Sequence, residues 1–202
     1  MPAEVSERSR IMDAAYRCLA TSNGDGVSVT DILREAGLST RAFYRHFDSK
    51  DNLLLAMFRR DSDRVHAELE SAALAAGSPT EALRAWIEGY LRLTSQPRRR
   101  QRVLVLSSAE LMRAAGYADE RTRSMIRLQD GIAEILRRGL DDGSFPWAAP
   151  EPDARAIRAA LTEAFAEQMS RSTTVPAAVA ADQVINFAFR ALGARRPGET
   201  GQ

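Results

Sequence analysis

The amino-acid sequence predicts an all-α protein with about nine helices. Apolar residues recur three and four positions apart over most of the 202 residues, which is the spacing of one helix face. Clusters of Gly, Pro, Ser, Asn and Asp separate these stretches and supply helix stops and starts. The apolar run 103–106 is short enough for a strand, but the residues after it have helical spacing. These observations favour a helical fold over a mixed or all-β one.

Composition narrows the class of protein. The formal net charge is +1, so any attraction for nucleic acid has to come from a local basic surface. The single cysteine, Cys18, excludes a disulfide framework, and with only His46 and His66 beside it the usual metal-ligand sets cannot form. No apolar run approaches the ~18 residues of a membrane span, and the first nine residues lack the apolar core of a signal peptide. We therefore expect a cytoplasmic protein without a metal, a cofactor or a membrane partner.

The first helix is expected over residues 9–21, after an arm of eight residues without packed structure. Ile11, Ala15 and Leu19 share one face of this helix. A run of Ser, Asn, Gly and Asp ends it, because these residues are typical of turns.

Two short helices around a glycine turn are expected next, over 29–36 and 40–47. The hydroxyl-bearing residues just before the helix starts in this region are Ser28, Ser39 and Ser49. Such hydroxyls accept hydrogen bonds from unpaired backbone N–H groups of a first turn. Gly37 suits the left-handed conformation that commonly ends a helix. The arrangement is a helix-turn-helix, whose second helix can enter a DNA major groove.

The second short helix is expected to have two faces. Phe43 and Phe47 are four positions apart and should pack inward. Their expected partners are Ile32, Leu33, Ala36 and Leu38. The outward side chains are Thr40, Arg41, Tyr44 and Arg45. Their hydroxyls and guanidiniums can hydrogen-bond phosphates and base edges, and Arg41 can donate two bonds to a guanine. Ser39 and Thr40 at the helix start, and Lys50 in the next helix, can each take a phosphate. The alternative is that these cations form an ordinary solvated surface.

A long helix is expected from residue 50 to about 75, and the domain boundary inside it. Residues 1–55 form the expected DNA-binding domain and residues 56–202 the C-terminal helical domain. The basic run 98–102 is expected to be a loop and helix start, and the Pro-rich stretch 146–152 a loop. The other expected helices cover about 80–95, 103–115, 119–140, 153–172 and 177–194.

One combined pattern in the helix-turn-helix is highly specific. It reads Ala-Gly-Leu-Ser, four residues, Tyr-Arg-His-Phe, two residues and Lys, from Ala36 to Lys50. Further matching positions are Ile32, Glu35, Phe43, Ser49, Leu53 and Leu54. With these residues, the stretch 9–58 resembles the N-terminal signature of TetR-like (tetracycline-repressor-like) bacterial transcription regulators. Arg41-Ala42 departs from the Gly-Thr that this family often has there.

The resemblance implies a homodimeric regulator, usually a repressor that leaves a palindromic operator when a small effector binds. The positions implied to contact DNA are Ser28, Thr30, Ser39, Thr40, Arg41, Tyr44, Arg45 and Lys50. The helices over 153–172 and 177–194 would pair with those of a second chain around a two-fold axis. The alternative is that their apolar faces serve only the core of one chain.

An effector pocket is expected among the middle helices, for an apolar or amphipathic small molecule. The candidate residues are Trp86, Tyr90, Met112, Tyr117, Met125, Gln129, Phe165 and Met169. A regulator that responds to a protein partner or to no ligand, or that activates transcription, is the alternative, and a helical adaptor that binds no DNA is another. An enzyme is not expected, because the sequence has no Gly-rich phosphate loop, no metal spacing and no histidine in a plausible catalytic pair.

Overall fold

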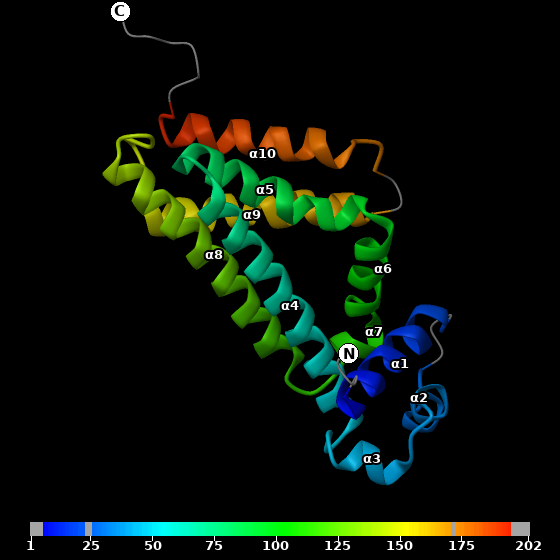
Figure 1. Cartoon of the computed structure of the whole chain (residues 1–202). Helices are drawn as coiled ribbons and strands as arrows, with labels where there is room; N and C mark the ends of the chain where they lie inside the picture. The colour runs from blue at the N-terminus through cyan, green and yellow to red at the C-terminus, as the bar shows by residue number, and fades with distance from the viewer. Residues whose placement is uncertain (1–5, 23–25, 171–172, 195–202) are drawn as a thin grey trace, which may run out of the picture. The chain divides into compact units, whose positions relative to one another are not determined.

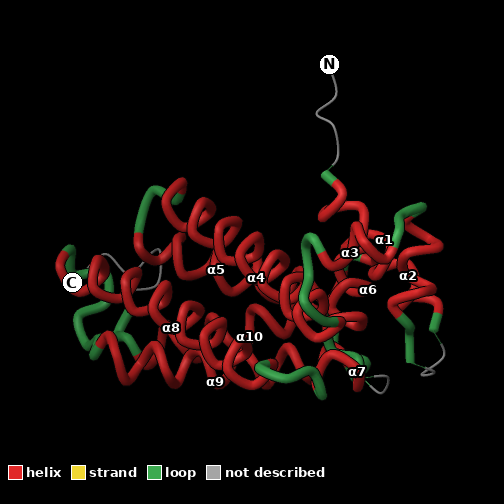
Figure 2. The backbone as a smooth tube through the Cα atoms, turned by 90° about the horizontal axis from the view of Figure 1, so that it is seen from below, coloured by secondary structure: helices red, strands yellow, loops and turns green. Residues whose placement is uncertain are grey.

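The structure, a computed structural model, describes residues 6–22, 26–170 and 173–194. Within these ranges every regular element is a helix (Figure 2). The all-α prediction is confirmed, with ten helices in the described residues where the sequence predicts about nine. None of these helices is long and apolar enough to cross a membrane.

The helices form two compact units (Figure 1). The N-terminal unit consists of Met1–Ser62 with Arg98–Thr122, and the C-terminal unit of Asp63–Pro97 with Arg123–Gln202. The long helices α4 (Lys50–Ala75) and α8 (Tyr117–Asp141) each give turns to both units. The functional boundary at residues 55 and 56 stays a prediction.

The N-terminal unit is built from four complete shorter helices, the start of α4, nearly all of α6, and the start of α8. The complete helices are α1 (Glu7–Thr21), α2 (Val29–Ala36), α3 (Thr40–Tyr44) and α7 (Ala109–Met112), and α6 spans Pro97–Leu106. One apolar core joins α1, α2, α3, α4, α6 and α7. Its fully buried members include Ile11, Ile32, Phe43, Leu53, Met57 and Leu111. Burial of such side chains is worth about 1.5–3 kcal/mol each, so this core fixes where α3 lies.

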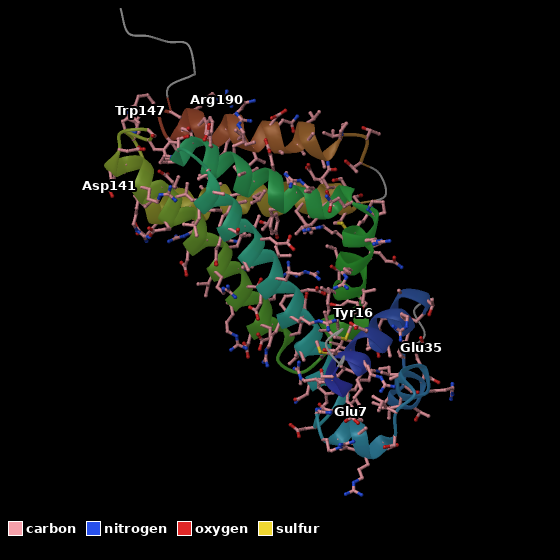
Figure 3. All side chains as sticks on the ribbon, in the orientation of Figure 1. Glu7, Tyr16, Glu35, Asp141, Trp147 and Arg190 are labelled. Carbon is pink, nitrogen blue, oxygen red and sulfur yellow. The ribbon has the colours of Figure 1, made fainter. Side chains whose placement is uncertain are left out.

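A buried polar cluster also ties α1, α4 and α6 together. Asp61 is only 4% exposed, and its carboxylate accepts hydrogen bonds from the Tyr16 hydroxyl and, at 2.9 Å, from Arg102 Nη1. The Arg102 guanidinium also lies 5.0 Å from the centre of the Tyr16 ring, which Figure 3 labels on α1. Because a buried charge without a partner is costly, these contacts favour this arrangement of the three helices.

The C-terminal unit contains the rest of α4 and α8 with three further helices. These are α5 (Pro79–Ser95), α9 (Pro150–Met169) and α10 (Ala177–Ala191), which lie side by side in Figure 1 and pack on one another. Their shared core includes the buried residues Leu83, Trp86, Ile132, Leu161 and Ala188.

The structure corrects three expectations about local structure. The basic run 98–102 lies inside α6, which begins at Pro97, because proline suits the first position of a helix. The expected helix over 103–115 is two helices, since the Ser108 hydroxyl caps α7 at Leu111 N (3.4 Å). Helix α9 begins at Pro150, inside the stretch expected to be a loop, because this proline also suits the first position of a helix.

The start of α1 and the end of α10 also differ from the sequence prediction. Ser6 and Glu7 are not part of an unpacked arm: the Ser6 hydroxyl caps α1 by accepting a hydrogen bond from Ser9 N (3.2 Å). Residues 1–5 of that arm, and residues 171–172 of the helix expected over 153–172, lie outside the described residues. Helix α10 ends at Ala191, where a helix to residue 194 is expected.

Candidate DNA-binding interface

The helix-turn-helix is held by three capping serines and one left-handed glycine. Ser28 accepts a hydrogen bond from Asp31 N (3.1 Å), Ser39 from Ala42 N (3.3 Å) and Ser49 from Asn52 N (3.1 Å). Gly37 ends α2 at φ 62°, a conformation that costs a residue with a Cβ roughly 1–2 kcal/mol. These caps set the turn between α2 and α3.

Helix α3 is anchored by the two phenylalanines that the sequence predicts to point inward. Phe43 is 1% exposed and Phe47 is 4% exposed, and their ring centres lie 5.7 Å apart. They belong to one core cluster with Ile32, Leu33 and Ala36, so the inward prediction is confirmed. The helix expected over 40–47 is shorter, since α3 ends at Tyr44. The chain continues to Phe47 as a hydrogen-bonded turn, in which Phe47 N donates to Phe43 O (2.9 Å).

The opposite side of α3 is open to solvent. Thr40, Arg41 and Tyr44 are exposed, and Tyr44 is 62% exposed although its ring packs edge-on against Phe43 (5.4 Å). Thr40 and Arg41 stand in the first turn of the helix and Tyr44 one turn later. This surface therefore offers two hydroxyls and a guanidinium to a groove or to phosphates.

Arg45 is held by a carboxylate at the start of α1. Its Nη2 lies 3.1 Å from Glu7 Oε2, and His46 Nε2 lies 3.0 Å from the same oxygen. The hydrogen bond with His46, and less strongly the charge of Arg45, lower the pKa of Glu7 below its usual value. Glu7, labelled in Figure 3, thereby sets the direction of Arg45. The sequence gives no sign of this role, because Glu7 is 38 residues away from Arg45.

Lys50 is paired in the same way with a residue that the sequence does not single out. Its Nζ forms an ion pair with Glu110 of α7, and both side chains are partly buried. The other Glu110 oxygen accepts a hydrogen bond from Val27 N (3.3 Å), next to the cap of α2. Glu110 thus connects α7 to both sides of the helix-turn-helix.

The start of α2 supplies the remaining candidates. Thr30 is exposed, whereas the Ser28 hydroxyl is already engaged, since it donates to Asp31 Oδ2 (2.5 Å). That hydrogen bond is the main reason that the pKa of Asp31 is lowered. All eight candidate DNA contacts therefore lie in the N-terminal unit, and three of them, Ser28, Arg45 and Lys50, carry internal side-chain partners.

The candidate effector residues fall in both units. In the C-terminal unit, Trp86 is buried, Tyr90 stacks on Phe165 (5.0 Å), and Met125 packs on the same core. There Gln129 Oε1 accepts a hydrogen bond from Arg158 Nε (3.3 Å), and Met169, at the end of α9, is partly exposed. In the N-terminal unit, Met112 is 49% exposed and Tyr117 packs edge-on against Phe58 (5.4 Å). The structure thus brings Trp86, Tyr90, Met125 and Phe165 into one core.

Comparison with known proteins points to the same segment. Residues 11–57 match the family model described as bacterial regulatory proteins, tetR family. This stretch contains α2, α3 and the first turns of α4, together with every candidate DNA contact named above. The matched family is regulatory rather than enzymatic.

Relatives extend the similarity beyond this segment. The HTH-type transcriptional repressor Rv1474c of Mycobacterium tuberculosis is 29% identical over 168 residues, which cover 77% of this chain and 89% of that protein. The HTH-type transcriptional repressor KstR of Mycolicibacterium smegmatis is 31% identical over 81 residues, and the chain spans 40% of its length. A solved structure, a TetR-like transcriptional regulator from Rhodococcus sp. RHA1, superposes with a TM-score of 0.68 at 23% identity, covering 96% of this chain and 100% of that one.

Proposed function

We propose that this chain is a TetR-like regulator, a homodimeric repressor that binds a palindromic operator and leaves it when a small molecule binds. The proposal includes a cytoplasmic location, where bacterial operators are found. One observation carries it. The exposed residues Thr40, Arg41 and Tyr44 share the open side of a helix that Phe43 and Phe47 anchor, within the segment that matches the family.

In this proposal α3 enters the major groove and the surrounding residues bind phosphates. Arg41 reads a base pair, because a guanidinium can donate two hydrogen bonds to a guanine. Tyr44, Thr40 and Ser39 bind phosphates or base edges along the groove, and Ser28 and Thr30 bind the backbone beside α2. Arg45 and Lys50 add cations to the same surface.

The ion pairs of Arg45 and Lys50 are part of this mechanism. A phosphate that approaches Lys50 competes with Glu110 for the ammonium, and one that approaches Arg45 competes with Glu7. Each carboxylate holds its cation in one direction before binding, and it also lowers the gain from a phosphate contact. The affinity for DNA therefore reflects a balance that one carboxylate substitution can shift.

The dimer is proposed to form through α9 and α10. Val179 and Phe187 of α10 are large apolar residues that are each 44% exposed in the single chain. A second copy related by a two-fold axis would cover them and would place two α3 helices on two half-sites.

Release is proposed to follow from linkage between two sites. A small molecule that prefers the conformation with the wrong half-site spacing lowers operator affinity, and the operator lowers affinity for that molecule by the same factor. The proposed site lies among the core residues Trp86, Tyr90, Met125, Gln129, Phe165 and Met169, with Met112 and Tyr117 as further candidates.

Selection of bound duplexes from a random DNA library tests the proposed function. We expect a palindromic sequence to be enriched, and binding to weaken steeply as salt increases. Duplex binding that is absent, or that does not depend on salt, would show that the chain is a helical adaptor instead.

A further inference from the structure

Two buried side chains of the C-terminal unit have polar atoms without hydrogen-bond partners. His66 is 4% exposed and Trp86 is 1% exposed. Within the described residues, both ring nitrogens of His66 lack a hydrogen-bond partner. The indole Nε1 of Trp86 lacks one as well. Buried polar groups are almost always satisfied, since leaving one unpaired costs free energy. Three such atoms in one unit mark a position where a bound molecule can supply the missing partners.

His66 on α4 and Trp86 on α5 both lie beside α8, near Arg127 and Gly131, which are four residues apart on that helix. One turn after His66, Leu69 packs so closely on α5 that a Cβ at Gly89 would stand 2.8 Å from its Cδ2. Trp86 stands one turn before Gly89, and its ring lies against Gly131 of α8, where an added Cβ would stand 2.1 Å from Cη2. The two glycines thus bring α5 close to α4 and to α8.

His66 lies near ionised side chains of α4 and α8. Arg127, four residues before Gly131 on α8, reaches α4 on both sides of the histidine: its Nη1 lies 2.6 Å from Asp63 Oδ1 and its Nη2 3.6 Å from Glu70 Oε1. Burial, followed by the charge of Arg127, lowers the pKa of His66, although Glu70 and Asp63 act in the opposite direction. The imidazole is therefore neutral at pH 7 and offers one donor and one acceptor.

The chemistry of these groups limits what can bind. Trp86 Nε1 can only donate, so its partner must carry an acceptor. The Arg127 guanidinium is already shared by two carboxylates, so it does not favour an anion here. The surrounding residues are the apolar core of the unit, where a charged group would lose its hydration.

We propose that His66 and Trp86 are the polar contacts of the effector site, and that the effector is an uncharged, mainly apolar molecule carrying a hydrogen-bond-accepting oxygen, such as a carbonyl. The regulatory role of this ligand rests on the proposed function, but its binding can be measured without DNA. It adds His66 to the candidate residues and names the chemical class that Trp86 recognises.

The test uses the full chain and two matched pairs of probes, 2-octanone with octanoate and acetophenone with benzoate. Indole N–H resonances report binding, because the chain has only two tryptophans and Trp147 is 72% exposed. We expect the ketones to shift the Trp86 resonance downfield and to leave that of Trp147 in place. Trp86→Phe and His66→Phe should each weaken ketone binding by about ten-fold. The matched control, Trp147→Phe, should bind the ketones as the unmodified chain does.

A second measurement separates a binding role from a structural one. Because the His66 nitrogens have no partner, His66→Phe should keep or raise the thermal midpoint of the probe-free protein. A lower midpoint would mean that water or the fold itself satisfies this histidine, and would overturn its role in the site. Carboxylates that bind as well as ketones, ketone binding that both variants retain, or no shift of Trp86 with any probe would also overturn the proposal.

Failure of this inference is distinguishable from failure of the proposed function. A chain that selects a palindromic operator but shows no Trp86 response to the ketones remains a regulator, with its effector site elsewhere or absent. A chain that binds the ketones through His66 and Trp86 but selects no duplex keeps this site and loses the proposed function.

Discussion

At the scale of single residues, two buried rings hold α3 in place and two carboxylates hold the cations beside it. The burial of Phe43 and Phe47 follows from their spacing of four, which α3 and the hydrogen-bonded turn after it place on one side. The carboxylates that hold Arg45 and Lys50 come from α1 and α7, far away in sequence. No local pattern brings Glu7 or Glu110 to these cations, so only the folded chain shows their pairing.

Lys50 and Glu110 give the first prediction. Lys50→Ala should weaken duplex binding about ten-fold on every sequence and reduce the slope of log affinity against log salt by about one. Glu110→Gln should strengthen binding, because the carboxylate no longer competes with phosphate for Lys50. Fluorescence anisotropy over a salt series measures both. Glu134→Gln, which removes a carboxylate paired with Arg137 (3.0 Å) on α8, is the matched control. An unchanged salt slope for Lys50→Ala would contradict the phosphate contact.

Arg41 gives a prediction about sequence preference. It is exposed in the first turn of α3, where its guanidinium is free to face a groove. Arg41→Ala should lose about 1–3 kcal/mol of discrimination at one base pair and leave the preference at other positions intact. Repeating the duplex selection with this variant shows the change, and an identical selected motif would refute base reading by Arg41.

His66 gives a prediction about pH. Its pKa is lowered from 6.5 in the folded chain, so the unfolded chain binds the proton more readily. The free energy of unfolding should therefore fall as the pH decreases from about 7 to 5, by no more than about 1.4 kcal/mol per pH unit. Urea unfolding at several pH values measures this slope. The slope should be smaller in His66→Phe, and an equal slope in both proteins would mean that His66 does not titrate differently on folding.

At the scale of elements, the sequence predicted helices well and their ends less well. The helix-turn-helix was predictable because its caps act within a few residues. These caps are Ser28, Ser39, Ser49 and Gly37. Two predicted helix starts are wrong at prolines. Pro97 begins α6 and Pro150 begins α9, earlier than the sequence predicts. A proline stops one helix and starts the next equally well, and only the packing decides between them.

Close contact between α5 and α8 gives the prediction at this scale. Gly131→Ala would place a Cβ 2.1 Å from the ring of Trp86, which is fully buried and cannot swing away. The overlap should cost more than alanine gains in a helix, a net loss of about 1–2 kcal/mol. Gly89→Ala is the matched control, because its Cβ would meet only the flexible end of Leu69 (2.8 Å). Thermal unfolding compares the two, and a Gly131→Ala protein as stable as the original would argue against this tight packing.

At the scale of the whole molecule, the fold class and the family resemblance could be predicted from the sequence, and the comparisons support both. The candidate effector residues were harder to predict, because an apolar stripe looks the same whether it faces a core or a ligand. Met112 and Tyr117 illustrate this, since they belong to the N-terminal unit and are not members of the core cluster that contains Trp86.

The proposed dimer gives the prediction for the whole molecule. Phe187→Glu should shift the protein from dimer to monomer at micromolar concentration, because each copy would bring a charge to an apolar two-fold contact. Operator affinity should fall as well, since a monomer binds only one half-site. Leu74→Glu, at a site on α4 that is 77% exposed, should stay dimeric. Analytical ultracentrifugation tests both, and a dimeric Phe187→Glu protein would place the contact elsewhere.

The two sides of α3 also bear on how such a protein can change over generations. Ala42, Phe43 and Phe47 hold the helix in place, while Thr40, Arg41 and Tyr44 contribute little to the buried core. Substitutions at the exposed positions can therefore accumulate without loss of fold. A duplicated copy of the gene could acquire a new operator through a few such changes and keep its scaffold intact.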